Sequence, residues 1–393
     1  MKKRMDTPHA CKVAHKEAPR IAEFFAGIGL VRLAAEKQGM KVVFANDIDP
    51  KKEQIYAENF GKEDFWLGDI HALRADDIPQ AEIYTASFPC NDLSVAGSMA
   101  GLAGEHSGAF WGLVRILRTK KENGETPRFV VLENVPGFLT SRGGADLRAA
   151  LMALNELGYG VDVVRVDALH FTPQSRARVF VIADLGADAP VPFSLEDGEV
   201  RPGPLARFIQ ANSDLQWFIR NWPRLPKRLG TLSDIVEDPA EDDALWWNEE
   251  RTAYFMQQLS PKHEKLAAEM VASKDFRYAT AFRRVRKGRS MAELRVDGIA
   301  GCLRTPRGGS GRQILFRGGK GTARVRLLSA RECARLQGAP DDFQLNVPLN
   351  QALFGFGDAV CVPVVEWVLE HGIWPRIKGE AVSKNAARLL PLS

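Results

Sequence analysis

The sequence predicts an α/β fold with a doubly wound, mostly parallel sheet, followed by a smaller and irregular second domain. Three features support this prediction. Between residues 20 and 185, short apolar segments rich in β-branched residues alternate with helical patterns. From about residue 186 this alternation is lost and proline becomes frequent. The chain has 393 residues, which is long enough to bury two cores.

The predicted strands are continuous apolar runs, as expected for strands that are buried on both faces. Segments with helical periodicity lie between them. In the last of these helices, leucines recur at helical spacing, and Gly158 is suited to end the helix. The strands are expected at 21–25, 41–45, 81–88, 128–133, 161–166 and 178–184, and the helices at 30–37, 50–59, 108–121 and 146–157.

Patterns outside this region are less regular. An acidic run surrounds Trp246 and Trp247, and a helix-like stretch at 252–273 precedes a basic, glycine-rich segment. The apolar helical pattern at 360–371 is expected to dock back onto the first domain. The expected organisation is a loose basic tail (1–18), an α/β domain (19–185), a second domain (186–346) and a returning C-terminal segment (347–393).

The net charge of +4 conceals a strong asymmetry. Between Arg277 and Arg326 there are fourteen lysines and arginines but only two acids, Glu293 and Asp297. Such a concentration is typical of a surface that binds a polyanion. A solvated basic surface with no ligand is the alternative.

The five cysteines are widely scattered and form no CxxC pair. This pattern argues against a disulfide scaffold and against a zinc site, and it fits a reducing cytoplasm. We therefore expect no metal. The basic N-terminus lacks the apolar core of a signal peptide, and we expect no apolar run of membrane-spanning length.

Cys90 lies in the stretch SFPCNDLS, residues 87–94, directly after a predicted strand. Pro89 fixes its own φ and disfavours helix in Phe88, so the strand should end at the thiol. Several glycines follow in residues 94–108, which is typical of a loop that moves. A thiol at a strand end beside such a loop suits a nucleophile that closes over a large substrate. A small buried cysteine is the alternative.

The first strand runs into FFAGIGL, where Gly27 and Gly29 would let the backbone approach a ligand at the start of a helix. Asp47 ends the second strand, where a carboxylate can accept hydrogen bonds from ribose hydroxyls, and Asp69 is a third candidate. The full GxGxxG is absent because position 32 is Arg, and a Walker lysine is also missing. These features favour a smaller adenosyl ligand over a dinucleotide or a triphosphate.

Glu133 ends the fourth core strand, at the sheet edge where ligands of open α/β folds bind. It should therefore lie near Cys90, although a turn or helix-cap acid is the alternative. Arg176 and Arg178 lead into the last strand at alternating positions and should face the same side. Together they would form a fork for a phosphate or a base oxygen, unless they only protect an edge strand.

These motifs, in this order, resemble the DNA cytosine-5 methyltransferase family. The series is FFAGIGL, NDID, GDI, FPC, ENV and PQSRAR, followed by LLSARECARLQGAPDDF and FGFGDAV near the end. It covers the chain apart from the N-terminal tail and the region from about 186 to 300. The resemblance implies a catalytic and S-adenosylmethionine-binding domain at 19–185 and a target-recognition domain at 186–346.

The resemblance also implies a role for each matched residue. Cys90 would attack C6 of a flipped cytosine, and Glu133 would hydrogen-bond its N3–N4 edge. Arg178 would bind O2, and Arg176 would support the loop. The cofactor-binding residues would be Phe25, Gly27, Ile28, Gly29, Asp47, Ile48, Asp69, Ile70, Pro89, Asp358 and Ala359, and the DNA-binding residues would be Arg283, Arg284, Arg286, Lys287, Arg304, Arg307 and Arg312.

The implied reaction needs these groups. Addition of sulfur at C6 makes the poorly nucleophilic C5 enamine-like, so that it can take a methyl group from a sulfonium. Glu133 would stabilise the charge that develops at N3. Base flipping would cost a few kcal/mol, which phosphate contacts would partly offset. The sequence does not identify the base that removes the C5 proton.

The sequence departs from the family pattern at three positions. Asn91 replaces the usual Gln after Pro-Cys, Asp358 replaces the usual Asn of the final motif, and Leu30 replaces a frequent third glycine. The change at Asp358 puts its cofactor contact in doubt. None of the three removes an expected catalytic group.

Three other functions remain open at this stage: an RNA cytosine-5 methyltransferase, a non-catalytic DNA-binding relative and, more remotely, a nicotinamide dehydrogenase. The long basic region favours DNA, because reading a sequence needs additional protein. The resemblance further implies a monomeric bacterial enzyme of the cytoplasm. It would protect host DNA beside a restriction or phage-defence system.

Overall fold

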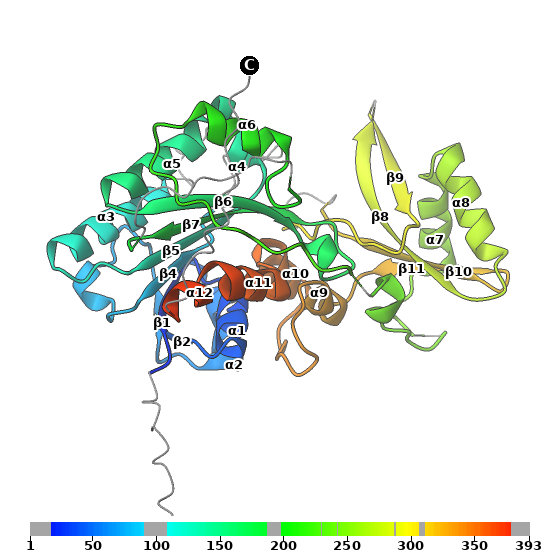
Figure 1. The fold of residues 1–393 in the computed structure, drawn as a ribbon. Coiled ribbons are helices and arrows are strands. Elements are labelled where there is room, and N and C mark those ends of the chain that lie inside the picture. Colours follow the sequence, from blue (N-terminus) through cyan, green and yellow to red (C-terminus); the bar gives the residue numbers. More distant parts are fainter. Residues whose placement is uncertain are drawn as a thin grey trace, which may run out of the picture.

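The computed structural model describes residues 17–89, 108–186 and 198–378, apart from residues 229, 242, 287 and 306–310. Within these residues the chain forms a seven-stranded sheet and a separate four-stranded sheet (Figure 1). The Asn91 and Cys90 positions lie outside the described residues. The α/β prediction with a smaller second unit is confirmed.

The larger sheet has the strand order β3-β2-β1-β4-β5-β7-β6. Strands β1 to β5 pair in parallel. Strand β7 lies between β5 and β6 and is antiparallel to both. The strand order reverses beside β1, which is where open α/β sheets bind ligands. The strands are β1 (Arg20–Phe24), β2 (Lys41–Asp47), β3 (Phe65–Leu67), β4 (Ile83–Ala86), β5 (Phe129–Asn134), β6 (Gly160–Asp167) and β7 (Ala177–Asp184).

Helices cover both faces of this sheet (Figure 1). Ile21 packs into one core with α1 and α11, whereas Ala22 and Phe24 pack into the other with α3 and α5. This alternation is the period of two that a strand imposes on its side chains. One face carries α1 (Leu30–Lys37), α2 (Pro50–Phe60), α10 (Leu349–Asp358), α11 (Val362–Gly372) and α12 (Trp374–Ile377), and the other carries α3 (Ala109–Glu122), α4 (Gly137–Thr140), α5 (Ala145–Glu156) and α6 (Gly203–Ala211).

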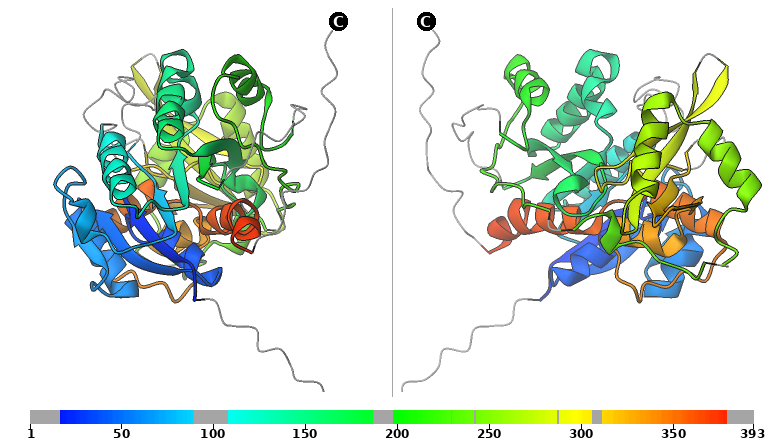
Figure 2. Two further views of the ribbon diagram at one scale, coloured as in Figure 1. Left: turned by 60° about the vertical axis from the view of Figure 1, so that its left-hand side comes forward. Right: turned by 90° about the vertical axis from the view of Figure 1, so that its right-hand side faces the viewer.

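The smaller sheet is antiparallel, with the order β11-β10-β8-β9. Phe255 and Phe316 lie in its own apolar core. Figure 2 shows the β8–β9 hairpin projecting from this unit. Its elements are α7 (Glu249–Gln257), α8 (Pro261–Val271), β8 (Arg277–Arg286), β9 (Arg289–Arg295), β10 (Ile314–Gly319) and β11 (Thr322–Leu327), and α9 (Ala330–Leu336) leads back to the larger sheet.

All six strands and the four helices expected in the first half are present. Each observed end lies within two residues of the predicted one. The short strand β3 was not predicted. The helix expected at 252–273 is wrong as a single element, because Pro261 begins a new helix after Ser260. The second unit is also more regular than its sequence pattern indicates, since it contains a complete sheet.

The segment after α6 packs on the larger sheet. Val161 N donates to Gln216 O at 3.0 Å, and Phe218 N donates to Val161 O at 2.8 Å. A boundary at residue 186 would therefore assign to the second domain some residues that extend the first sheet. The proposed boundaries remain predictions.

The C-terminal helices return to the first sheet, as expected, and bury Val365 and Leu369 beside α1. In the described part of the chain, one stretch, Leu349–Ile377, is long and apolar enough to pass a test for a membrane span. This differs from the expectation that no such run exists. However, 78% of its most apolar window is buried inside the protein, and it consists of three separate helices.

Candidate active site

The candidate site lies where the parallel strands end. The carboxyl ends of β1, β2, β4 and β5 share one edge of the sheet, and the antiparallel β7 begins at that same edge. The sheet therefore brings together most of the predicted residues of the first domain, although they lie far apart in the sequence. Among the described residues, no group of three or more His, Cys, Asp or Glu could hold a metal ion.

The turn after β1 has the unusual backbone that a close ligand approach requires. Phe25, Gly27 and Gly29 all have positive φ, at 57°, 58° and 86°. For Phe25 this conformation is strained, and such strain is found mostly at functional sites. A Cβ on Gly27 would meet nothing within 4 Å, whereas one on Gly29 would lie 2.4 Å from Phe60. Gly27 thus leaves open space for a ligand, and Gly29 lets α2 pack closely. Ile28 is buried in the core behind this turn.

Asp47 fixes the glycine turn to the end of β2. Its carboxylate accepts a hydrogen bond from Gly27 N at 2.8 Å and another from Asp49 N at 2.9 Å. The neighbouring Ile48 is 66% exposed. An exposed apolar side chain beside an anchored acid fits an adenosyl group, with Ile48 against the base and Asp47 near the ribose.

The two predicted residues after β3 differ in accessibility. Asp69 is exposed, and its carboxylate accepts from His71 N at 2.9 Å. Ile70 is 3% exposed and lies under α3, where a Cβ on Gly112 would come within 2.7 Å of it. Ile70 therefore supports this corner from below, and its contact with a cofactor remains a prediction.

Sequence reasoning missed Glu23, which lies in β1 two residues before Phe25. It is fully buried, and neither carboxylate oxygen has a hydrogen-bond partner. Burial raises its pKa to about 8, although Arg32 acts in the opposite direction. An acid inside an otherwise apolar strand was the signal that could have identified it. The carboxyl group of Glu23 therefore lies in the core beneath the glycine turn.

Glu133 and Arg178 form the centre of the site. Arg178 Nε donates to Glu133 Oε1 at 2.8 Å, and both side chains are mostly buried, with 14% and 11% exposed. Asn134, next to Glu133, donates from its side chain to Phe88 O at 3.2 Å. This bond ties the end of β5 to the segment that leads through the half-buried Pro89 into Cys90. Cys90 itself lies outside the described residues.

Arg176 does not join Arg178 in an open fork. It is 2% exposed, and its terminal nitrogens donate to Leu303 O at 2.7 Å, Gly357 O at 3.1 Å and Ala359 O at 2.6 Å. Burial lowers its pKa, and Arg178 adds to this effect. The prediction of a two-arginine ligand fork is wrong for this residue, because backbone carbonyls occupy its donors. Arg176 instead joins three chain segments, which fits the supporting role that the resemblance implied.

Cys302 is a thiol beside Arg176, and sequence reasoning did not single it out. Arg176 donates to its Sγ at 3.3 Å. Burial raises the pKa of the thiol, but Arg176, Arg178 and Arg304 together outweigh this and lower it. A lowered pKa makes a thiol more reactive.

The final motif contributes Asp358 and Ala359. Lys52 Nζ lies 2.9 Å from Asp358 Oδ2, and Thr305 Oγ1 donates to Oδ1. Burial raises the pKa of Asp358, but Lys52 and Thr305 lower it below its ordinary value. The acid that replaces the usual Asn is therefore paired with Lys52, and it joins the cofactor side to the segment around Arg304. Ala359 contributes its carbonyl oxygen to Arg176.

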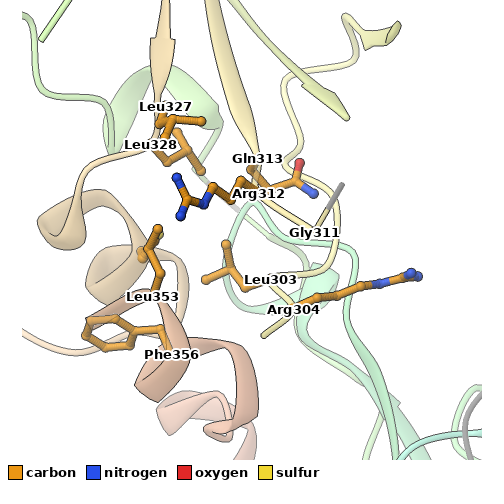
Figure 3. Close-up of a pocket in the computed structure, with 10 residues that line it drawn as sticks. Leu303, Arg304, Gly311, Arg312, Gln313, Leu327, Leu328, Leu353 and Phe356 are labelled. Carbon is orange, nitrogen blue, oxygen red and sulfur yellow. The ribbon is translucent and has the colours of Figure 1, made fainter. Parts of the chain in front are cut away.

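The structure describes the side chains of four of the seven predicted DNA-binding residues: Arg283, Arg284, Arg304 and Arg312. Lys287, Arg307 and the side chain of Arg286 lie outside the described residues. Arg283 and Arg312 have neutral partners, Gln258 and Asn350. Arg284 faces Glu293 at 3.8 Å, and Arg304 is exposed. In Figure 3, Arg304 extends away from a pocket that is lined by Leu303, Arg312, Leu353 and Phe356.

The basic segment is less positive than its composition indicates. Arg317 pairs with Asp238 at 2.8 Å and with Glu241, and Arg326 pairs with Glu332 at 2.6 Å. Asp238, Glu241 and Glu332 all lie outside the basic segment, which runs from Arg277 to Arg326. Further pairs join Arg295 to Asp297 and Arg324 to Glu241.

Comparisons with known proteins agree with this arrangement. The family model described as C-5 cytosine-specific DNA methylase matches residues 19–373. The chain is 30% identical over 347 residues to the type II methyltransferase M.NgoBI of Neisseria gonorrhoeae, covering 88% of this chain and 90% of that protein. It is 29% identical over 344 residues to M.HaeII of Haemophilus aegyptius, covering 87% and 89%.

Solved structures resemble the fold. The Dnmt2 methyltransferase of S. pombe superposes with a TM-score of 0.58 at 18% identity, covering 91% of this chain and 99% of that one. The methyltransferase EhMeth of Entamoeba histolytica gives 0.59 at 15% identity, covering 91% and 98%. At these identities the likeness concerns the fold alone.

Proposed function

This chain belongs to the C-5 cytosine-specific DNA methylases, and from that premise we propose that it transfers a methyl group from S-adenosylmethionine to C5 of a cytosine in a specific duplex DNA sequence. The observation that carries this proposal is the Glu133–Arg178 pair at the carboxyl edge of the sheet. It lies beside the segment that enters Cys90 and across the edge from the glycine turn.

In the proposed reaction, the sulfur of Cys90 forms a bond to C6 of the cytosine, and electron density moves toward N3. Glu133 shares or donates a proton there, while Arg178 holds the carboxyl group and reaches toward O2. C5 takes the methyl group as the bond between the methyl carbon and the sulfonium sulfur breaks, which leaves a neutral thioether. A base then removes the C5 proton, the ring double bond re-forms, and the C6–S bond breaks.

Residues of the sheet edge would hold the cofactor, which supplies an electrophilic methyl group on a sulfonium. Asp47 would bind the ribose, and Ile48 and Asp69 would contact the adenine. Phe25 and the backbone from Gly27 to Gly29 would form the wall of the site. Lys52 and Asp358 would close it from α2 and α10.

The cytosine would have to leave the duplex to reach this edge, because C6 is stacked inside the helix. The smaller sheet and its basic residues would hold the DNA and read its sequence. We also propose that the protein works as a monomer in a bacterial cytoplasm, where it protects host DNA beside a restriction or phage-defence system. The type II relatives support this setting.

The test is methylation in a host that lacks its own cytosine methylation. Bisulfite sequencing of DNA from cells that express the full chain should show one methylated sequence, and Cys90→Ser should leave that sequence unmodified. An absence of methylation with the wild-type chain would refute the proposal. In vitro, competition between duplex DNA and transfer RNA for the labelled methyl group separates the RNA alternative: incorporation into RNA alone would replace DNA as the substrate.

A further inference from the structure

Two arginines of the smaller unit share one indole ring. Arg251, on α7, has its guanidinium carbon 4.0 Å from the centre of the Trp247 ring. Arg283, on β8, lies 5.6 Å from the same ring, and its Nε donates to Gln258 at 2.9 Å. An aromatic face attracts a cation, but it does not neutralise one. Two positive charges are thus held close together by groups that carry no negative charge.

These arginines differ from most others in the unit. Across the described residues, no carboxylate lies within 4.0 Å of the guanidinium nitrogens of Arg251, Arg283 or Arg312, whereas Arg295, Arg317, Arg324 and Arg326 each have an acidic partner. Arg312 donates only to the amide oxygen of Asn350. Burial lowers the pKa of Arg251, and the nearby charges of Arg283 and Arg312 lower it further. Arg251 and Arg283, which share one indole ring, therefore repel each other.

A fold keeps uncompensated like charges together only at a cost, which an anionic ligand removes. Arg251 stacks on Trp247, so that its N–H groups stay available for other partners. Planar guanidinium groups match the geometry of a phosphate. Arg251 comes from α7 and Arg283 from β8, and the Trp247 ring brings these two side chains together.

We propose that Arg251 and Arg283 form a site for one backbone phosphate of duplex DNA, with Trp247 as its rigid support. The inference rests on the proposed function for its choice of ligand. It adds Arg251 and Trp247, which lie outside the basic segment, to the DNA-binding surface. It also assigns these arginines to holding the duplex, and not to reading its bases.

The test uses the full chain and a fluorescein-labelled duplex of mixed sequence. Equilibrium affinity is measured at several salt concentrations for the wild type, Arg251→Gln and Arg251→Lys. Arg295→Gln serves as a matched control, because it removes the same charge from the same unit at an acid-paired position. We expect Arg251→Gln to lower the slope of log K against log salt by about 0.9, the value for one lost phosphate contact. Arg251→Lys should restore most of the slope, and Arg295→Gln should leave it unchanged.

Two outcomes would overturn this proposal. One is a slope for Arg251→Gln equal to that of the wild type. The other is a change in the methylated sequence, which would show that Arg251 reads a base. S-adenosylmethionine affinity should match the wild type, since Arg251 is on the surface of α7; a cooperative melting transition shows that each variant is folded. If the wild type binds DNA with this salt dependence but never methylates it, the proposed function fails while the phosphate site stands.

Discussion

Arg176→Lys tests whether Arg176 acts by supporting the site. The guanidinium donates to three backbone carbonyls and to Cys302 Sγ, with almost no exposure to solvent. An ammonium group keeps the charge, but it is a point donor and cannot span these acceptors on two sides. We expect at least two of the three carbonyl bonds to be lost.

The magnitude follows from the number of bonds. A hydrogen bond from a charged donor contributes about 1.5–3 kcal/mol, so two lost bonds cost about 3–6 kcal/mol of unfolding free energy. This is a large part of the total stability of about 5–15 kcal/mol that is typical of a domain. Urea unfolding followed by tryptophan fluorescence would measure it. Arg148→Lys is a matched control, because Arg148 bonds Asn212 and Asp214 at the surface, where water replaces lost bonds and the change in stability should be small.

The two explanations of Arg176 give opposite results. If Arg176 supports the loop, the free energy of unfolding of Arg176→Lys falls. Methylation by the protein that remains folded falls as well, because its site is less ordered. A variant as stable as Arg148→Lys that nevertheless loses methylation by more than about 100-fold would refute this reasoning. Arg176 would then contact the substrate directly.

Three further predictions concern the cofactor side. Gly29→Ala should destabilise the protein by about 2–4 kcal/mol in thermal unfolding, because its Cβ would clash with Phe60 at a position of positive φ. Gly27→Ala should mainly weaken S-adenosylmethionine binding, because its Cβ meets open space. Equal effects of the two variants on stability would contradict this. Because the folded-state pKa of Glu23 is raised from 4.5 to about 8, the wild type should lose up to about 5 kcal/mol of stability as pH rises between these values, and Glu23→Gln should abolish that loss; identical pH profiles would show that Glu23 finds a partner. Asp358→Asn keeps an acceptor for Thr305 but breaks the ion pair with Lys52. Since the pKa of Asp358 is lowered, this pair stabilises the fold at neutral pH, and the stabilisation is lost as pH falls through the lowered value. The stabilities of the wild type and the variant should therefore converge in acid.

The sequence predicted the larger sheet well because its signals are local. Runs such as that ending at Glu133 are apolar throughout, and parallel strands place their carboxyl ends at one edge. The order of the motifs was therefore enough to bring Glu133, Arg178 and Asp47 to the same edge. Pro89 and the glycine turn were also predicted, because their backbone requirements depend on residue type alone.

The parts that were missed depend on contacts between distant residues. Arg176 and Arg178 have the same spacing and residue type, and only the carbonyls of α10 and of Leu303 show that one points into the protein. Strands β8 and β11 are rich in arginine and resemble a solvated loop, because the acids that neutralise Arg324 and Arg326 lie elsewhere in the chain. Arg251, which has no acidic partner among the described residues, directly follows an acidic run, and its stacking on Trp247 depends on the fold.

Trapping on a duplex that contains 5-fluorocytosine in the recognised sequence tests the central claim most directly, because fluorine at C5 blocks release of the bound sulfur. With S-adenosylmethionine present, we predict a stable protein–DNA adduct for the wild type and none for Cys90→Ala. Cys302→Ser is the matched control, since Cys302 is a thiol beside Arg176 whose pKa is lowered; it should still form the adduct. An adduct that persists in Cys90→Ala, or one that disappears only in Cys302→Ser, would contradict the account.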